Sequence, residues 1–350
     1  MTITRVSSRR AALTGLALCL LLLSCEQTDL VAMKPHDGAA CTDPECSNPP
    51  LCEARDCTQL AATSGFCLQT GELVSVGDSC ADDDPTKQRF RFAVCSCTDF
   101  VTTSTVLIDG PGTTAIAIDR ELRVGSGVTL QADVRVGETL RSGEANAPDV
   151  QGELIEHAAP SCACDPNTLL DVADVVAQHR DDNDNAQLGL DSRKLDGFDQ
   201  PTDIDIECGR LYLSRIAGAR ALQLKVHGRV ALFVAGNVEL DDTLSIEVDD
   251  AARLTLLVAG NVRVGGTLDV SSAAGAANVR LVVGGAGTID LGGQTRVVGA
   301  LYAPRAELVT RGRFELTGAM FVRRAAPGAE LALHYDAALM DVSVDDCAAP

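Results

Sequence analysis

The chain has 350 residues, of which 46% are hydrophobic and 3% aromatic, and its 49 acidic side chains outnumber 29 basic ones, for a formal net charge of −20. A surface this acidic repels nucleic acid and anionic lipid headgroups, so neither is expected as a partner. Cationic surfaces, neutral sugars and divalent cations are compatible with it.

The first 24 residues have the layout of a secretory signal peptide. Three arginines precede an apolar run over residues 11–23, which is too short to span a membrane. The segment Leu22-Leu23-Ser24-Cys25 resembles the lipobox of bacterial lipoproteins. The resemblance implies that Cys25 becomes the first mature residue and carries several acyl chains, which together anchor a protein stably. An ordinary signal peptide with an incidental cysteine is the alternative.

The residue after Cys25 is Glu26, and the absence of Asp there resembles the pattern of lipoproteins that pass to the outer membrane. We therefore expect an outer-membrane lipoprotein, facing either the periplasm or the cell surface. Loss of residues 1–24 removes three Arg and no acid, which takes the formal charge from −20 to −23. Residues 25–40 lack a regular apolar pattern and are expected to be a flexible tether.

The chain contains 14 cysteines, of which Cys19 leaves with the signal peptide and Cys25 takes the lipid. The even number that remains is typical of disulfides in an exported chain. Residues 41–100 hold too few large apolar side chains for a hydrophobic core, so we expect a disulfide-rich module there. Its cysteines are Cys41, Cys46, Cys52, Cys57, Cys67, Cys80, Cys95 and Cys97. The other disulfide candidates, expected to staple the larger domain, are Cys162, Cys164, Cys208 and Cys347.

A metal site is the alternative for two close pairs of cysteines, Cys95-Ser96-Cys97 and Cys162-Ala163-Cys164. Zinc prefers cysteines separated by two to four residues, often together with His. No His lies between Cys41 and Cys97, so the sequence favours disulfides without specifying their pairing.

One phrase occurs twice in the second half of the chain. LFVAGNVELDDTLSIEV (232–248) is followed by LLVAGNVRVGGTLDV (256–270), and looser copies begin near Val279, Gly299 and Gly318. Apolar residues alternate in short runs between turn residues, which indicates strands. About three short strands per copy predict a right-handed parallel β-helix, or solenoid, over residues 101–350. Residues 113–140 show the same alternation, so two or three further coils are expected there.

Stacked coils place equivalent inward side chains about 4.8 Å apart. Leu232, Leu256 and Leu281 should therefore form one internal file, in which full burial of each side chain contributes about 1.5–3 kcal/mol. Asn237 and Asn261 occupy the same turn, where Asn tolerates left-handed backbone and can pair with its counterpart one coil away. A β-sandwich is the alternative fold, but the fixed period favours the solenoid.

One helix is expected between the two β stretches. Asp165 and Pro166 suit a helix start, as a cap and a first-turn residue, and apolar residues from Leu169 to Val176 then share one face. This predicts a helix over residues 167–179, inserted in the solenoid at about 167–180. Because solenoid ends must hide their interior and unpaired edge, the helix should lie across an end or flank of the stack.

The stretch DDNDNAQLGLD (181–191) invites comparison with the helix-loop-helix calcium loop. That loop requires Gly at its sixth position and Glu at its twelfth, where this chain has Ala186 and Ser192. The motif fails, although Asp182 and Asp184 remain candidate calcium ligands, with a polar loop as the alternative. No cofactor and no other metal are expected.

Parallel β-helices also host polysaccharide lyases and hydrolases, which use paired carboxylates. The pairs Asp241-Asp242 and Asp249-Asp250 lie in predicted turns and point to opposite sides. His334-Tyr335-Asp336 is a local cluster for which a packed terminal strand is the simpler interpretation. We therefore expect no catalytic residues. A polysaccharide-active enzyme is the alternative, and it predicts a lateral groove lined by two acids or by an acid and an arginine.

Five segments carry a family resemblance: DNDNAQLGLD, CGRLYLSRI, GRVALFVAGNV, VGALYAPRAELV and HYDAALMD. In them the chain resembles bacterial envelope lipoproteins of unknown function, whose C-terminal solenoid, with a Gly-x-Leu-Tyr-Ala-Pro turn, also occurs in PilX-like, pilus-associated proteins. Over residues 103–347 this implies a right-handed β-helix displayed at the cell envelope, with no catalytic residues to carry over. GALYAP (299–304) follows the pattern, whereas GGAG (284–287) departs from it.

The sequence thus favours a non-enzymatic, lipid-anchored envelope protein that presents an acidic β-helix for adhesion, scaffolding, or association with pili or matrix. An envelope protein or a glycan is the expected partner, and no oligomeric state is specified. The densest basic stretch is a candidate contact for an acidic partner and consists of Arg305, Arg311, Arg313, Arg323 and Arg324.

Overall fold

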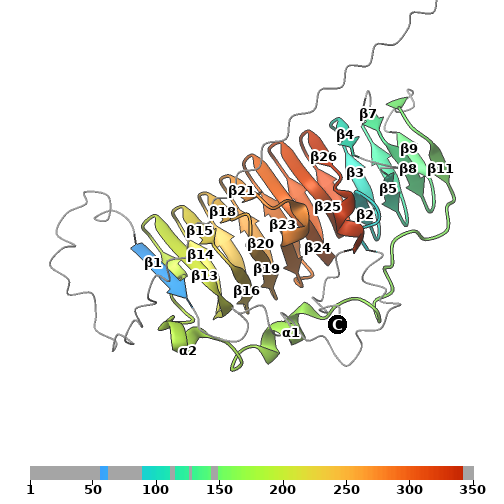
Figure 1. The fold of residues 1–350 in the computed structure, drawn as a ribbon. Helices are drawn as coiled ribbons and strands as arrows, with labels where there is room; N and C mark the ends of the chain where they lie inside the picture. Colours follow the sequence, from blue (N-terminus) through green and yellow to red (C-terminus); the bar gives the residue numbers. More distant parts are fainter. Residues whose placement is uncertain (1–55, 62–88, 111–114, 126–127, 143–148, 342–350) are drawn as a thin grey trace, which may run out of the picture. The chain divides into compact units, whose positions relative to one another are not determined.

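The computed structural model describes residues 56–61, 89–110, 115–125, 128–142 and 149–341, all of which belong to one compact unit, Pro50–Pro350. Their strands pair in parallel and wind into a β-solenoid of about ten turns (Figure 1). The mainly β fold and the parallel solenoid predicted from the sequence are confirmed. The β-sandwich alternative is wrong, because sandwich sheets are antiparallel.

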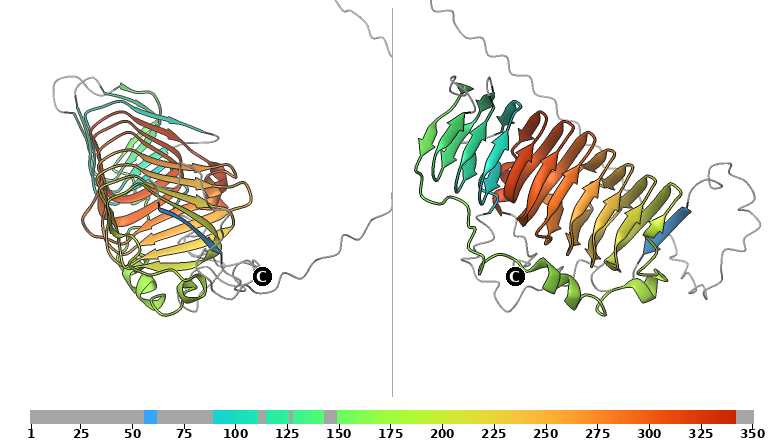
Figure 2. Two further views of the ribbon diagram at one scale, coloured as in Figure 1. Left: turned by 90° about the vertical axis from the view of Figure 1, so that its left-hand side faces the viewer. Right: turned by 180° about the vertical axis from the view of Figure 1, so that it is seen from behind.

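The pairings form three ladders, which we call walls 1, 2 and 3; Figure 2 shows the coils winding around a shared interior. Wall 1 contains the second half of β13 (Thr202–Leu213), β16 (Arg229–Val234), β19 (Arg253–Val258), β22 (Val279–Val283), the middle of β24 (Thr295–Thr310) and of β25 (Phe314–Pro327), β2 (Val94–Ser96), β5 (Ala115–Ile118), β8 (Asp133–Val136) and β11 (Leu154–Glu156).

Wall 2 contains β12 (Asp196–Phe198), β14 (Ile216–Gly218), β17 (Val238–Leu240), β20 (Val262–Val264), β23 (Thr288–Leu291), the ends of β24 and β25, β3 (Phe100–Thr102), β6 (Leu122–Val124) and β9 (Leu140–Ser142). Wall 3 contains β1 (Asp56–Ala61), the start of β13, β15 (Leu222–Val226), β18 (Leu244–Val248), β21 (Leu268–Ser272), the starts of β24 and β25, β26 (Leu331–His334), β4 (Val106–Asp109), β7 (Thr129–Gln131) and β10 (Asp149–Val150).

The interior is built from files of aliphatic side chains. Leu232, Leu256 and Leu281 are register partners on successive coils of wall 1, as predicted. The whole file consists of Leu211, Leu232, Leu256, Leu281, Leu301, Met320, Val94, Ile116, Val134 and Leu154. All of these side chains except Leu154 are buried. The period-two alternation read from the sequence therefore predicted correctly which residues of successive coils lie side by side.

Glycine allows the three longest strands, β13, β24 and β25, to turn from wall 3 into wall 1 without a loop. Gly209, Gly299 and Gly318 lie at these corners with φ of 137°, 152° and 143°, which side-chain-bearing residues rarely adopt. A Cβ at Gly318 would also lie 2.0 Å from the Gly299 carbonyl oxygen. In GALYAP, the glycine thus makes the corner and Leu301 enters the interior file.

The predicted asparagine pairing is confirmed at the corner between walls 1 and 2. The Asn261 backbone N–H donates to Asn237 Oδ1 at 3.0 Å, and the Gly287 N–H donates to Asn261 Oδ1 at 3.0 Å. The predicted left-handed backbone at these residues is wrong, since among the non-glycine residues with described conformation only His157 has positive φ. The amide side chain, not an unusual backbone, is what this turn requires.

The order of coils in the stack differs from their order in the chain. Residues 94–156 wind from β2 to the β11 end, and residues 196–334 wind from the β1 end back to meet them (Figure 1). Wall 1 of the first group joins the second at β2–β25, and wall 3 joins at β4–β26. The ladder therefore includes β1 and β2, which fall within the range expected to form the Cys-rich module.

Residues 157–195, which we call the strap, connect the two groups and run back along the stack (Figures 1 and 2). The strap contains α1 (Val172–Gln178) and α2 (Asn185–Leu188), and two 3-10 helices, η3 (Ala276–Asn278) and η4 (Ala337–Asp341), lie later in the chain. The flank position expected for the helix is confirmed. Its predicted start at residue 167 is wrong, because Asp171 is the cap, accepting from the Asp174 N–H, while Asp165 closes a separate turn.

Candidate functional site

From β13 to β5, one outward row of wall 1 is buried as completely as the solenoid interior. The row consists of Tyr212, Phe233, Leu257, Val282, Tyr302, Phe321, Cys95 and Ala117, none of them more than 7% exposed; its continuation, Arg135 on β8, is exposed. The strap contacts this row: the His179 ring stacks on Phe233 with centroids 4.0 Å apart, and the Leu170 N–H donates to the Tyr302 hydroxyl at 3.2 Å. The molecule therefore has a second apolar core outside the coils.

The α1 helix approaches wall 1 closely where the third repeat departs from the pattern. At Gly284, a Cβ would lie 2.7 Å from Cβ of Val172, the first residue of α1, which is fully buried. Gly284 thus leaves room for the helix, while Gly285 and Gly287 of the same loop lie against Asn261 of the previous coil.

Two disulfides fasten the strap to wall 1. Cys95 is bonded to Cys162 and Cys97 to Cys164, so each Cys-x-Cys segment pairs with the other in the same direction. The metal alternative for these cysteines is therefore wrong in this oxidised chain. Asp119, which lies close to Cys162 and Cys164, accepts from the N–H groups of Ser161 and Cys162 at 2.9 and 3.1 Å, and burial raises the pKa of its carboxyl.

The remaining cysteines are only partly visible. Cys208, on β13, is disulfide-bonded, and Cys57 lies on β1, whose backbone alone is described. Cys25 and the other disulfide candidates lie outside the described residues, namely Cys41, Cys46, Cys52, Cys67, Cys80 and Cys347. Lipid attachment and the Cys-rich module thus remain predictions.

The candidate calcium ligands lie at the C-terminal part of the strap, beside β13. Asp184 is 2% exposed; its Oδ2 accepts from the Arg210 N–H at 2.7 Å, and its own N–H donates to the Arg210 carbonyl at 2.7 Å. Asn185 pairs with the next outward residue, accepting from the Tyr212 N–H at 2.9 Å and donating to the Tyr212 carbonyl at 2.6 Å. Asp182 is exposed and forms an ion pair with Arg210.

These contacts act as a β-strand would, because they satisfy backbone groups along the unpaired edge of β13. The geometry favours the alternative of a polar loop with structural contacts over a calcium site. In the part of the chain that the structure describes, Asp182 and Asp184 do not belong to a cluster of three metal-binding side chains.

A buried arginine lies beneath the strap. Arg89 is 1% exposed; one guanidinium nitrogen donates to the Tyr302 hydroxyl at 2.6 Å and another to the Thr168 carbonyl. The guanidinium also lies over the Tyr302 ring, 5.0 Å from its centroid. Burial is the main cause of the raised pKa of Tyr302, so this phenol stays neutral and joins wall 1, the strap and the segment that leads into β2.

The outward residues of walls 2 and 3 are mostly polar, and many pair with the next coil. Arg263 bonds Asp241 at 2.6 Å, and Glu121 bonds both Arg123 at 2.6 Å and Arg141 at 2.9 Å. The hydrogen bond from Arg123 is the main cause of the lowered pKa of Glu121. The pair of Arg263 with Asp241 is exposed, and such a surface pair contributes about 0–1 kcal/mol, whereas the Glu121 side chain is buried between its two arginines.

The five arginines proposed to contact an acidic partner are largely occupied within the molecule. Arg311 pairs with Asp290 at 2.8 Å, Arg324 with Glu307 at 2.8 Å, Arg313 with Glu330 at 3.4 Å and Arg305 with Asp171 at 3.9 Å. Arg323 donates to the Arg305 carbonyl at 3.0 Å. Four of these guanidinium groups bridge neighbouring coils and that of Arg305 reaches the strap, so they do not form a free basic patch.

Two histidines on wall 3 each lie between carboxylates of neighbouring coils. His227 Nδ1 is 2.8 Å from Asp249 and its Nε2 is 3.6 Å from Asp205, and the hydrogen bond with Asp249 is the main cause of its raised pKa. His334 Nδ1 is 2.7 Å from Asp109. In the cluster His334-Tyr335-Asp336, the Tyr335 hydroxyl donates to the Phe90 carbonyl and Asp336 accepts from the Ala338 N–H. Tyr335 and Asp336 of this cluster therefore bond to backbone groups, which is a structural role.

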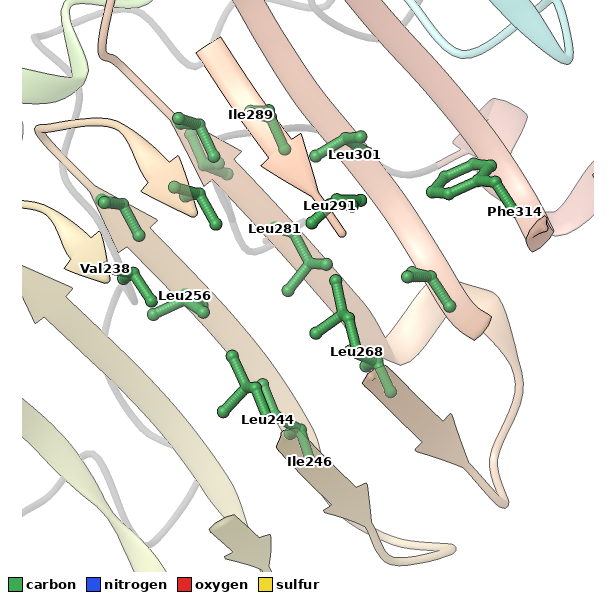
Figure 3. A pocket seen from close by; sticks show the side chains of 16 residues that line it. Val238, Leu244, Ile246, Leu256, Leu268, Leu281, Ile289, Leu291, Leu301 and Phe314 are labelled. Carbon is green, nitrogen blue, oxygen red and sulfur yellow. The ribbon is translucent and has the colours of Figure 1, made fainter. Parts of the chain in front are cut away.

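One cavity inside the coils, among the described residues, is apolar. A void of about 50 Å³ lies between the files and is lined by aliphatic side chains and Phe314 (Figure 3). A shallow polar hollow lies outside, beside α2, and its lining includes Arg180, Asp181, Asp191, Arg193 and Tyr212. Two of the hydrogen bonds within this lining run from Arg180 to the Tyr212 hydroxyl at 3.4 Å and from the Arg193 N–H to Asp191 at 2.9 Å.

The sequence prediction missed two features, the buried outer face of wall 1 and the contacts of Asp184 and Asn185 with β13, which we call the clamp at α2. A signal for the first was present: ALFV (231–234) and LLV (256–258) are continuous apolar runs, which is typical of strands buried on both faces. The clamp gave no such signal, because an Asn that mimics a strand is indistinguishable in sequence from one in a polar loop.

The model of one family of unknown function matches residues 154–342, more than half of the 350 residues. The match covers β11, the strap and all later coils, and it excludes the coils of residues 94–150. No curated protein matches the chain. No helix among the described residues is long and apolar enough to cross a membrane. The chain belongs to the family described as Domain of unknown function (DUF7305).

Proposed function

We propose that this protein is a non-enzymatic lipoprotein of the bacterial cell envelope, whose solenoid is displayed for adhesion, scaffolding, or association with pili or matrix. The observation that carries the proposal is the division of side chains among the walls. Every long apolar row is buried, either inside the coils or beneath the strap, while walls 2 and 3 present charged and polar rows. A regular charged surface on a rigid ladder suits contact with an extended partner.

The envelope location rests on the residues before the solenoid. The signal-peptide layout, the segment Leu22-Leu23-Ser24-Cys25 and the absence of Asp at position 26 support an outer-membrane lipoprotein. The solenoid family resemblance to PilX-like proteins supports a surface role. An envelope protein or glycan is the proposed partner, while the acidic charge disfavours nucleic acid.

Metabolic labelling with an alkyne analogue of palmitate tests the anchor. The chain should incorporate label and sediment with membranes, whereas Cys25→Ser should lose both properties, because the lipid provides the attachment. Cys19→Ser, which alters the discarded segment, is the matched control and should behave like the parent chain. Equal labelling of Cys25→Ser would refute the lipoprotein assignment.

Display is tested by labelling intact cells. Antibodies to the solenoid should bind intact cells if the protein faces outward, and only permeabilised cells if it faces the periplasm. Purified protein should then bind an envelope glycan or protein fraction without altering it. Release of new reducing ends from any member of a glycan panel would contradict the non-enzymatic proposal and favour the polysaccharide lyase or hydrolase.

A further inference from the structure

The two ends of the solenoid are finished differently. At the β1 end, β1 and β12 are the outermost described strands of walls 3 and 2, whereas wall 1 is closed, because Asp184 and Asn185 bond to the backbone of the second half of β13. At the other end the last strands are β9, β10 and β11, and no strand among the described residues pairs with their outer edges (Figure 1).

The open end exposes both backbone groups and apolar side chains. The Val134 N–H donates to the Glu153 carbonyl, so residues 153 and 155 face β8 and the backbone groups of Leu154 point away from it. Leu154 ends the interior file of wall 1 and is 37% exposed. The other two files end at Leu140 and Val150, which are only partly buried.

The rim of this end is acidic. Asp149, Glu153 and Glu156 are all exposed. Asp149 accepts from the Gln151 side chain at 3.0 Å, and Glu156 accepts from the Leu140 N–H at 2.7 Å. None of these three carboxylates forms an ion pair with a basic side chain in the described ranges. A second copy meeting this end face to face would bring like charges together, which opposes self-association.

The molecule itself shows that such an edge accepts a strand from elsewhere. Strand β1 adds in parallel to β13, from which it is separated by more than 100 residues of chain, and β2 adds in the same way to β25. In both places a separate segment extends the ladder without an intervening loop. Main-chain pairing provides the affinity in this mode, and side-chain contacts provide the specificity.

We propose that the β9–β11 end is a docking edge for an extended polypeptide segment in which apolar and basic residues alternate. The segment adds as a parallel strand to β11, with an apolar residue over Leu154 and basic residues beside Glu153. This inference deepens the proposed display function, because it names the partner as a basic strand from another protein. It also gives a reason for the coils of residues 94–156, which carry the edge.

Fluorescence anisotropy with labelled peptides tests the proposal on the purified full-length mature chain in detergent. The probe is a peptide of about ten residues in which Val and Lys alternate. We expect saturable binding of one peptide per chain. A Val-Glu peptide, and a Val-Lys peptide with a central Pro, should each bind at least about tenfold more weakly, because one reverses the charge and the other breaks the ladder.

A charge reversal at the edge locates the site. Glu153→Lys should weaken Val-Lys binding at least about fivefold, whereas Glu247→Lys, an exposed acid on wall 3, should change it less than about twofold. Circular dichroism checks that both variants fold. Equal loss in the two variants, or equal binding of the proline peptide, would overturn the proposal in favour of nonspecific charge attraction.

Analytical sedimentation tests whether a second copy of this chain, and not a basic strand, occupies the edge. If the chain forms dimers that Leu154→Arg abolishes, the edge pairs with a second copy and the basic-strand proposal is wrong. These assays use purified protein, so their failure leaves the lipid anchor and surface display to be judged by the cell experiments.

Discussion

Wall 1 and wall 2 have the same interior construction but opposite outer faces. The outward row of wall 1 holds Phe233, Leu257 and Val282, each at most 1% exposed, whereas the equivalent row of wall 2 holds Glu239, Arg263 and Asp290. The strap accounts for the difference, because it packs on this row of wall 1. A solenoid of this kind has two cores, and a residue's outward direction does not by itself make it a surface residue.

Truncation of outward side chains should separate the two walls most strongly. Phe233→Ala should lower the free energy of unfolding by about 3–5 kcal/mol, since it opens a cavity beneath His179. Arg263→Ala on wall 2 should change it by less than about 1 kcal/mol, because only a surface ion pair is lost. Urea unfolding of the two variants measures this difference. Similar costs would mean that the strap does not cover wall 1.

Removal of the disulfides should show that both bonds stabilise the fold by closing the same loop. Each closes a loop with a sequence separation of 67 residues, so the second closes a loop that the first has already closed. Breaking both should cost about 2–5 kcal/mol, while Cys97→Ser with Cys164→Ser alone should cost much less. Thermal unfolding of the single-bridge and bridge-free variants provides the test, and additive losses would contradict it.

The clamp at α2 should matter less than the apolar contacts. Asn185→Ala leaves the N–H and carbonyl of Tyr212 without these partners, and should cost about 1–3 kcal/mol. Gln187→Ala, at an exposed position of the same short helix, is the control and should be within about 0.5 kcal/mol of the parent. Hydrogen exchange at Tyr212 should accelerate in Asn185→Ala only.

The smallest effect distinguishes two histidines by the sign of their pH dependence. Burial is the main cause of the lowered pKa of His179, against the ordinary value of 6.5, so its contribution to stability is lost as pH falls below that value. The pKa of His227 is raised, so its contribution is present below 6.5 and is lost as pH rises through the folded-state pKa.

Melting temperatures at pH 5.5 and pH 8 test this prediction. Relative to the parent chain, His179→Gln should lose less stability on acidification, and His227→Gln should lose more. Shifts of the same sign in both variants would contradict the burial of His179 beneath the strap.

Features that depend on apolar alternation and on the repeated phrase were predicted correctly from the sequence. The file of Leu232, Leu256 and Leu281 and the pairing of Asn237 with Asn261 follow from the repeated phrase, because each coil reuses the same register. The helix start was misplaced because Asp165 and Asp171 both suit a cap, and only packing of Val172 against Gly284 selects the second.

The order in which the coils stack could not be predicted from the sequence pattern. Alternation places Val94 and Met320 on inward positions of their own coils, but nothing local shows that these two coils are neighbours. The pairing of Cys95 with Cys162 depends on the same long-range arrangement. The open edge at Leu154 was unpredictable for this reason too, since a strand's pattern does not reveal whether another strand follows it.

Mapping the native disulfides tests the central claim, that the strap returns across wall 1 to the coil containing β2. A non-reducing digest analysed by mass spectrometry should yield a peptide containing Cys95 and Cys97 joined by two bonds to a peptide containing Cys162 and Cys164. Linkage of Cys95 or Cys97 to cysteines of residues 41–80 instead would show that the strap is not fastened there, and the account of a covered wall would be wrong.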